Sequence, residues 1–294
     1  MNTLLFLSFI IPGTFLLGLN DVLVRKTLKR GSIDEQLLIA FEFIGVSAVL
    51  LIPLLTVGAP EIKDGFWIAA LVTIFFNIFA QWAWYGAFRR EEASLISPLR
   101  LLTPPLVIIT GYVVLSEAPT LGGVIGILVT VFGLWFLIDG EAKRWKINFS
   151  KIIKRPGMLL GLWGAISFAI SLPFDKQAVV TSSALFAVTV LFFGVGLGNL
   201  LLAFFRSRKK PLKLDFSKEW RTALFLPFVH GLASFLTYSS MSYALIAYNA
   251  SVKRLWSFWA VVLSGKFLKE GNINRKLAAT LIMLLGIAVT LVLG

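Results

Sequence analysis

Apolar residues are grouped along this chain in long stretches, which are separated by short polar segments. The hydrocarbon core of a bilayer is about 30 Å thick, so a helix needs about 20 consecutive apolar residues to cross it. Ten stretches come close to this length, and each predicts a membrane-spanning helix. Their approximate bounds are 4–24, 36–57, 66–88, 94–115, 120–138, 157–176, 183–205, 222–245, 247–268 and 276–293. The segments between them are too short to hold a soluble domain.

The two halves of the chain repeat one pattern. When the sequence is shifted by 153 residues, the end of the first half aligns with the end of the second. The aligned pairs are Tyr85 with Tyr238, Arg100 with Lys253, Leu115 with Leu268, Glu117 with Glu270, Leu128 with Leu281, and Gly133 with Gly286. An acidic residue therefore ends the fourth helix of each half. We divide the chain into a first five-helix repeat (1–140), a basic linker (141–156) and a second five-helix repeat (157–294).

Lysine and arginine are distributed unevenly between the loops. The loops after helices 1, 3, 5, 7 and 9 hold 23 of the 28 lysine and arginine residues. Basic loops stay in the cytoplasm, so the bias predicts that both termini lie outside. In the first half the basic loops follow the odd-numbered helices, whereas in the second half they follow its own second and fourth helices. The two halves are therefore expected to insert in opposite orientations. We predict an all-α membrane protein of ten transmembrane helices in two inverted five-helix repeats. This architecture is typical of secondary transporters, whose substrate site lies near the midplane.

Composition agrees with this class of protein and excludes others. Hydrophobic residues make up 57% of the chain and charged residues 15%, whereas soluble proteins carry about 25% charged residues. The net charge of +13 is explained by the basic loops, so we expect contact with membrane lipid and no nucleic-acid partner. The chain has no cysteine, and hence no disulfide. We see no pairing of a nucleophile with a base, and therefore expect no enzyme, no cofactor and no metal.

Two segments resemble a known family. They are "YGAFRREEASLISPLRLLTPPLVIITGYVVLSEAPTLGGVIGILVTVFG" (85–133) and "YSSMSYALIAYNASVKRLWSFWAVVLSGKFLKEG" (238–271). An apolar helix, a terminal glutamate and a glycine-containing helix follow in the order seen in the drug/metabolite transporter superfamily, in its EamA-like form. The resemblance covers nearly the whole chain and implies a transporter that works by alternating access. It also implies both termini in the cytoplasm, contrary to the charge bias.

One branch of that superfamily, the triose-phosphate/phosphate translocators, is similar at the site. Those proteins hold phosphate with a basic residue on helix 4 and a Lys-Arg pair on helix 9. By this resemblance, Arg100 and the pair Lys253–Arg254 would bind an anion. Gln81 and His230 are the nearest counterparts of the hydrogen-bonding residues on helices 3 and 8.

Four residues place a full charge well inside predicted spans: Glu42, Arg100, Lys253 and Arg254. A charge at the centre of a membrane helix costs about 2.5–3.5 kcal/mol on insertion scales, so such residues face a cavity, a partner or the interface. For the cations the alternative is a long side chain that snorkels to the interface. For Glu42 the alternatives are a charge partner and a proton carrier. Pro104 and Pro105 remove backbone hydrogen bonds beside Arg100, which predicts an opened or kinked helix there.

Three helices carry polar faces near these charges. The residues are Asn77, Gln81, Trp84 and Tyr85 on helix 3, His230, Ser234, Thr237 and Tyr238 on helix 8, and Asn249, Lys253, Trp256 and Ser257 on helix 9. We take Asn77, Trp84, Tyr238 and Asn249 as further substrate-binding candidates. The alternative for each face is hydrogen bonding between helices.

The leading hypothesis is a secondary transporter of a small organic anion, phosphorylated or a carboxylate, that works as an exchanger in a prokaryotic plasma membrane. An unfilled cluster of three cations would be costly to move, which favours exchange. Neutralising any one cation is expected to preserve folding and to weaken binding about 10- to 100-fold, the loss of about 1.5–3 kcal/mol. The alternatives are an exporter of amino acids or related zwitterions, a lipid flippase or scramblase, and a receptor subunit.

Overall fold

The computed structural model describes residues 3–103, 106, 121–139, 155–208, 211–240, 243 and 252–293. Within this part of the chain, all regular structure is helical. The elements are α1 (Thr3–Arg30), α2 (Glu35–Val57), α3 (Phe66–Arg90), α4 (Ala93–Ile96), the 3-10 helix η1 (Ser97–Leu102), α6 (Leu121–Asp139), α8 (Pro156–Val180), α9 (Ala184–Ser207), α10 (Phe216–Ser240), α12 (Leu255–Leu268) and α13 (Ile273–Leu293).

The helical class and the membrane-spanning character predicted from the sequence are confirmed. In a bilayer every backbone N–H and C=O must be paired within the protein, which makes long apolar stretches helical. Within the described residues, six helices are long and apolar enough to span a membrane: α1, α2, α3, α8, α9 and α10. The total of ten stays a prediction, because the expected spans 94–115, 222–245 and 247–268 lie partly outside those residues.

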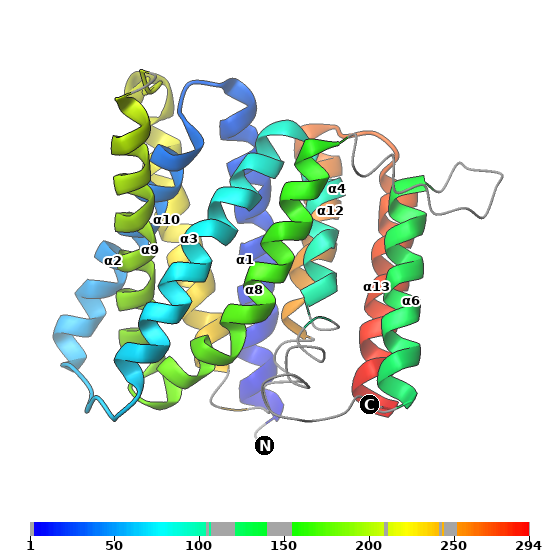
Figure 1. Cartoon of the computed structure of the whole chain (residues 1–294), viewed down its shortest axis with the longest axis horizontal. Helices are drawn as coiled ribbons and strands as arrows, with labels where there is room; N and C mark the ends of the chain where they lie inside the picture. Colours follow the sequence, from blue (N-terminus) through cyan, green and yellow to red (C-terminus); the bar gives the residue numbers. More distant parts are fainter. Residues whose placement is uncertain are drawn as a thin grey trace.

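The long helices run side by side between two polar ends (Figure 1). Both termini lie at the lower end in this view, and the basic segments around Arg30, Arg90 and Arg206 lie at the upper end, which we call the basic end. From the N-terminus α1 rises toward the basic end, whereas α8 descends from it. This geometry agrees with inverted repeats, which remain a prediction, as does the side of the membrane that the basic end faces.

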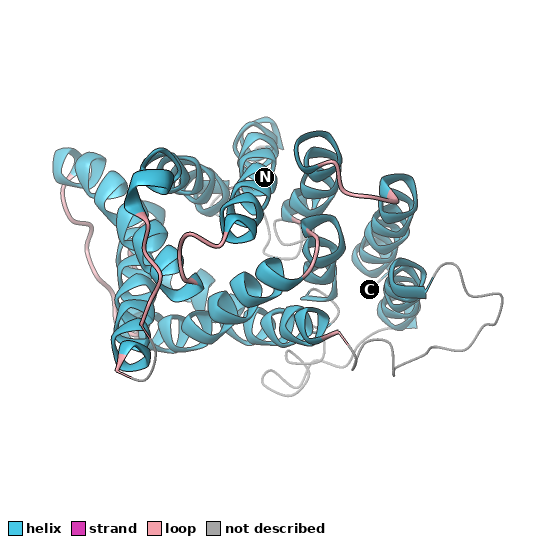
Figure 2. Cartoon of the chain, turned by 90° about the horizontal axis from the view of Figure 1, so that it is seen from above, coloured by secondary structure: helices cyan, strands magenta, loops and turns pink. Residues whose placement is uncertain are grey.

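Helices from the two halves pack against each other in matching pairs. The helix α1 packs on α10, and α3 packs on α8; α2 packs on α9, and α6 on α13. If α1 corresponds to α8 and α3 to α10, the first two pairings are equivalent under exchange of the halves. The pair of α6 and α13 stands at one edge, as the side view and the view from above both show (Figures 1 and 2).

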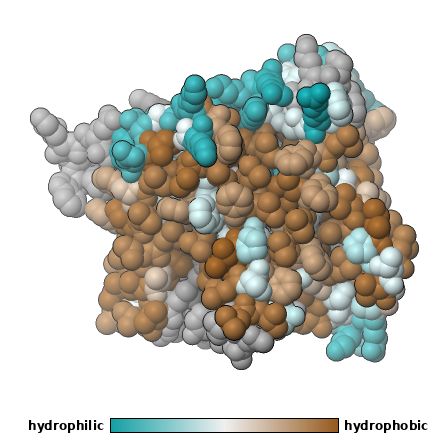
Figure 3. Space-filling view, turned by 180° about the vertical axis from the view of Figure 1, so that it is seen from behind, coloured by the Kyte–Doolittle hydropathy of each residue, from teal (hydrophilic) through white to brown (hydrophobic). Residues whose placement is uncertain are grey.

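The outer surface is apolar between the ends. A wide band of hydrophobic residues covers the middle, and hydrophilic residues gather mainly along the basic end and at part of the opposite end (Figure 3). Large side chains such as Trp67, Leu71 and Phe75 are more than half exposed. Such a band is suited to acyl chains rather than to water, as expected for an integral membrane protein.

Candidate functional site

Helix 4 of the first half changes its geometry where Arg100 lies. After the single turn of α4, the chain continues as the 3-10 helix η1. The backbone N–H of Thr103 donates to the carbonyl of Arg100, so this carbonyl is paired within a tighter turn. The sequence predicted a local break from Pro104 and Pro105. Those two residues lie outside the described part of the chain, but the departure from α-helix beside Arg100 is confirmed.

Helix 9 is interrupted at the aligned position. Arg254 lies in a turn directly before α12, and its carbonyl accepts a hydrogen bond from the backbone N–H of Ser257 at 3.0 Å. The Ser257 hydroxyl in turn donates to the backbone carbonyl of Ser97 at 2.8 Å. The beginning of α12 therefore lies against η1, which brings Lys253 and Arg254 to the region of Arg100.

These irregular segments border a cavity between the two halves. The cavity offers about 80 Å³ to the centres of water molecules. One water needs about 10–15 Å³ by this measure, so there is room for several. Its polar and charged lining includes Thr73, Asn77, Gln81, Arg100, Asp175, His230, Ser234, Lys253 and Arg254, and its aromatic walls include Phe43, Phe168, Phe192, Tyr238 and Trp256. All three predicted cations thus line one cavity. Their binding of a substrate stays a prediction.

Arg100 is enclosed on every side. Its guanidinium lies between two indole rings, 4.0 Å from the centroid of Trp84 and 4.1 Å from that of Trp256. It donates to Asp21 Oδ2 at 2.6 Å, and the same oxygen accepts from the Trp256 indole at 2.7 Å and from the Ser97 hydroxyl. We call Asp21, Arg100, Trp84 and Trp256 the clamp. Only 3% of Arg100 is exposed, so the snorkelling alternative is wrong for this residue.

Lys253 has a more open environment. Its ammonium lies 5.3 Å from the centroid of the Tyr238 ring, within the range of a cation–π contact. Asp175, on α8, lines the same cavity and attracts Lys253 electrostatically. One carboxylate oxygen of Asp175, Oδ1, is buried without a hydrogen-bond partner among the described residues.

Arg254 is the cation with the fewest partners among the described residues. It is 6% exposed, which excludes snorkelling, and its Nε is buried without a hydrogen-bond partner. The described neighbour with the strongest electrostatic effect on it is Arg100, which repels it. A buried guanidinium in this state keeps at least one donor without an acceptor among the described residues.

Glu42 lies behind the cavity wall rather than in it. Its carboxylate accepts hydrogen bonds from the Asn20 amide at 2.8 Å and from the Tyr85 hydroxyl, and it contacts His230 Nδ1 at 2.6 Å. Both roles expected for Glu42, charge partner and proton carrier, stay predictions. His230 combines this internal hydrogen bond with a place in the cavity lining.

The remaining candidates separate by position. Asn77, Gln81 and Tyr238 line the cavity, as expected of residues that could contact a solute. Trp84 is fully buried beneath Arg100 and belongs to the clamp. Asn249 lies outside the described residues.

Two carboxylates within the spans were missed from the sequence, Asp21 and Asp175. The expected spans ended at 24 and 176, which placed both residues close to a membrane interface. The helices continue to Arg30 and Val180, so both carboxylates lie deeper. Carboxylates therefore offset most of the positive charge of the three cations. Asp21 neutralises Arg100 and Asp175 offsets Lys253, which leaves Arg254 as the one of the three cations without a described carboxylate partner.

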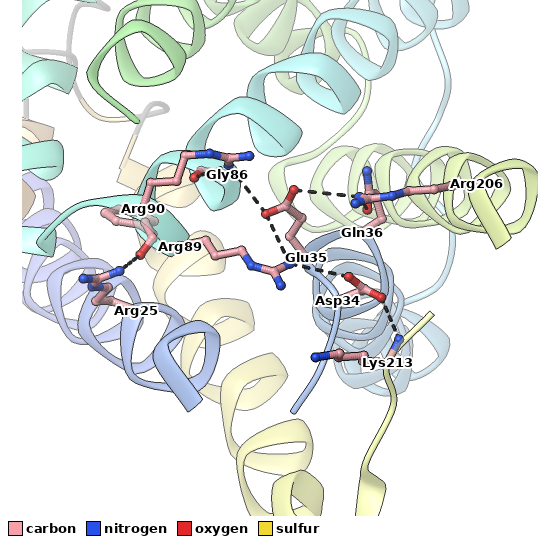
Figure 4. Close-up of polar contacts among 10 residues, drawn as sticks. Arg25, Asp34, Glu35, Gln36, Gly86, Arg89, Arg90, Arg206 and Lys213 are labelled. Atoms are coloured by element: carbon pink, nitrogen blue, oxygen red, sulfur yellow. Dashed lines mark hydrogen bonds and ion pairs between the residues drawn. The ribbon is translucent and has the colours of Figure 1, made fainter. Parts of the chain in front are cut away.

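A second group of charges closes the basic end (Figure 4). It borders a separate cavity of about 320 Å³ and comprises Asp34, Glu35, Arg89, Arg90, Arg206 and Lys213. Glu35 lies 3.8–4.0 Å from the guanidinium groups of the three arginines, which come from α3 and α9. Arg206 also donates to the Gln36 side chain at 2.6 Å. We call this group the basic-end cluster.

Backbone hydrogen bonds support the basic-end cluster. The N–H of Asp34 donates to the carbonyl of Lys213 at 3.0 Å, and the Asp34 carboxylate accepts from the Lys213 N–H at 2.6 Å. An isolated antiparallel bridge joins Ile33 to Leu214. The loop between α1 and α2 is thus attached to the loop between α9 and α10, which belong to different halves.

Glu270, the acidic residue after α12, also joins the halves. It accepts hydrogen bonds from the backbone N–H groups of Ala93 and Ser94, each at 3.0 Å, at the beginning of α4. A carboxylate at a helix N-terminus satisfies unpaired N–H groups and interacts favourably with the helix dipole. The terminal glutamate that the sequence singled out in the second half is therefore a cap for a helix of the first half.

Comparison with known proteins agrees with this two-part construction. Residues 4–139 and residues 155–292 each match the EamA-like transporter family. The chain belongs to this family. As an EamA-like protein it is a membrane transporter of small solutes, and the expected drug/metabolite transporter superfamily is confirmed, while the triose-phosphate translocator branch stays a prediction.

Other comparisons bear on the fold alone. A solved structure described as "Crystal structure of protein" superposes with a TM-score of 0.65 at 17% sequence identity, and the alignment covers 98% of this chain and 99% of that chain. No curated protein matches the chain significantly in sequence.

Proposed function

We propose that this EamA-like protein carries a small organic anion, with a phosphate or carboxylate group that binds at Arg254 and Lys253. The observation that carries the proposal is the state of Arg254, a buried cation that lines the cavity with its Nε unpaired. Burial of an unpaired charge is unfavourable, so an anion that enters the cavity gains from satisfying it. The planar guanidinium suits two acidic oxygens, and the neighbouring ammonium adds a point charge.

The cavity walls suit an organic rather than a fully hydrated ion. Five aromatic side chains, those of Phe43, Phe168, Phe192, Tyr238 and Trp256, face the space beside the cations. Ligand sites of this kind combine apolar walls with a few polar groups that fix orientation. Asn77 and Gln81 supply such neutral polar groups on the α3 side.

Alternating access is supported by the unequal ends of the molecule. The cavity-lining residues of α8 and α10, among them Asp175 and Tyr238, lie in the half of each helix that is remote from the basic end. The basic-end cluster joins the two halves at the other side. Opening toward the basic end therefore requires that Asp34 and Glu35 separate from their partners on α3 and α9 and from Lys213.

The charges in and around the cavity support an exchange mechanism, but less strongly than the sequence suggested. With Asp21 and Asp175 counted, one of the three cations, Arg254, has no described carboxylate partner. A bound anion supplies that partner, and an uncompensated charge in a membrane costs about 2.5–3.5 kcal/mol on insertion scales. The loaded carrier is then favoured over the empty one for crossing.

The test is binding by purified protein. Thermal unfolding is measured with a panel of phosphates, carboxylates, amino acids and nucleotides, and affinity for the best ligand is compared between wild type and Arg254→Gln. We expect an anion to stabilise the wild type and to bind the variant about 10- to 100-fold more weakly, the loss of a charge-assisted hydrogen bond worth about 1.5–3 kcal/mol. Arg208→Gln, which removes an exposed cation at the basic end, is the matched control. Equal affinity in wild type and Arg254→Gln would count against the proposal.

Asp175 favours a second candidate, an exporter of zwitterions. Its carboxylate lines the cavity with one oxygen unpaired, and so it could accept hydrogen bonds from an ammonium group while Arg254 binds the acid. Stabilisation by amino acids, but not by the corresponding acids without an amine, would favour this candidate over the anion carrier.

A further inference from the structure

The two halves contain corresponding pairs of an acid and a base. Arg100 and Lys253 are aligned by the 153-residue shift, and Asp21 and Asp175 lie 154 positions apart. Both carboxylates come from the first helix of their half, α1 and α8. Arg100 lies in the 3-10 helix η1, and Lys253 directly precedes the turn at Arg254 that interrupts the fourth helix of the second half.

The two pairs differ in how firmly they are held. Asp21 Oδ2 receives three hydrogen bonds and has its cation fixed between two tryptophan rings. Asp175 is 8% exposed, its Oδ1 has no hydrogen-bond partner, and it borders the cavity. Among the described residues, Lys253 lies over one aromatic ring, that of Tyr238. The second pair can therefore exchange partners at the expense of the Thr73 contact of Asp175, rather than of a network of three hydrogen bonds.

We propose that Asp175 is an exchangeable counter-ion of Lys253, which neutralises the ammonium in the empty cavity and gives way to the acidic group of the substrate. This inference rests on the proposed function of anion transport. It assigns Asp175 the role of a specificity-determining residue, because the carboxylate competes with the solute for the same cation.

Among the described residues in and around the cavity, Asp175 is the carboxylate available for this role, because the other carboxylates are already bonded. Asp21 is committed to Arg100, and Glu42 to His230, Tyr85 and Asn20. The other two cations in the described lining, Arg254 and Arg100, have the same sign as Lys253 and repel it. Without Asp175 the empty cavity would contain two uncompensated cations in a low-dielectric interior.

The experiment compares wild type with Asp175→Asn in detergent solution. Inorganic phosphate and sulfate serve as probes, and their affinities are obtained from thermal unfolding at increasing anion concentration. Because Asn keeps the size of the side chain and removes the competing charge, we expect both anions to bind the variant about tenfold more tightly, a change that corresponds to about 1.4 kcal/mol.

Two further variants make the result specific. Asp64→Asn removes an exposed carboxylate from the same end of the molecule, and we expect it to bind both anions like wild type. Asp175→Asn combined with Lys253→Gln removes both members of the pair, and we expect the affinity to return toward the wild-type value. If Asp175→Asn alone is too unstable, this charge-balanced double variant still tests the inference against Lys253→Gln alone, which should bind more weakly.

The outcomes separate this inference from the proposed function. If Arg254→Gln loses anion binding while Asp175→Asn binds no more tightly than wild type, anion transport keeps its support and the counter-ion role is overturned. If wild type binds neither probe but Asp175→Asn binds both, the counter-ion role stands and anion transport loses support. If neither protein binds either anion, both proposals fail.

Discussion

The clamp and the pair of Asp175 and Lys253 are built from the same parts in different surroundings. In the clamp, two tryptophan rings cover the faces of Arg100 at 4.0 and 4.1 Å, and one carboxylate oxygen accepts three hydrogen bonds. In the second half the corresponding carboxylate keeps an unpaired oxygen beside a cavity. The position of a charged residue in the repeat thus fixes its depth along the membrane-spanning helices. The neighbouring side chains decide whether the residue is held in a structural contact or is available to a solute.

This difference changes what should be expected of the cations. From the sequence, all three were equivalent, and neutralising any one was expected to preserve folding because it removes a charge from a span. The reasoning does not hold for Arg100, because its removal leaves Asp21 buried without its ion-pair partner.

The largest effect should come from breaking the clamp. Arg100→Gln leaves an uncompensated buried carboxylate at Asp21, and loss of one partner of a buried ion pair typically costs about 3–5 kcal/mol. We expect a large fall in the midpoint of thermal unfolding in detergent, together with low yield from the membrane. The double variant Asp21→Asn with Arg100→Gln should recover part of the loss. A fully stable single variant would mean that the two pairs are alike after all.

A steric change at the edge of the clamp should have an intermediate effect. A Cβ atom added to Gly164 on α8 would lie 2.7–2.9 Å from the indole of Trp84, so Gly164→Ala must displace that ring from Arg100. Overpacking of this kind typically costs about 1–3 kcal/mol. The control is Gly231→Ala, where the nearest atom is 3.7 Å away. We expect lower stability in the first variant only, with anion affinity lowered less than in Arg254→Gln.

The smallest effect on stability should come from Lys253→Gln. Its partner Asp175 borders a cavity with room for water, so the carboxylate keeps solvent close by. We expect a loss near the range of a solvated ion pair, about 0–1 kcal/mol. Thermal unfolding of Lys253→Gln and Arg100→Gln side by side gives the comparison directly. A loss in Lys253→Gln as large as that in Arg100→Gln would remove the distinction between the pairs.

The sequence predicted that Arg100, Lys253 and Arg254 lie around one cavity, because this placement follows from the repeat of the two halves. Apolar length located the helices, and the 153-residue shift placed Arg100 and Lys253 at equivalent points. Hydropathy could not locate helix ends, because basic residues at a membrane interface extend a helix without extending the apolar stretch. For this reason Asp21 and Asp175 were placed near the surface rather than in the site.

The roles of single side chains were harder to predict than their positions. Trp256 and Ser257 share a face with Lys253, and this favoured contact with a solute. In the structure their polar atoms bond Asp21 and the carbonyl of Ser97. A helical face shows which residues point in one direction, but the partner depends on which helix lies opposite, and one sequence carries no direct record of that.

The pairing of α6 with α13 has a consequence for how the protein is made. Added Cβ atoms at Gly133 and Gly286 would overlap Met283 and Thr130, so the two helices approach closely through glycine. During synthesis α6 is complete long before α13, more than 130 residues later in the sequence, leaves the ribosome. Throughout that interval the small-residue face of α6 must be covered by lipid or by the insertion machinery. The first half therefore cannot reach its final packing until α13 has been made.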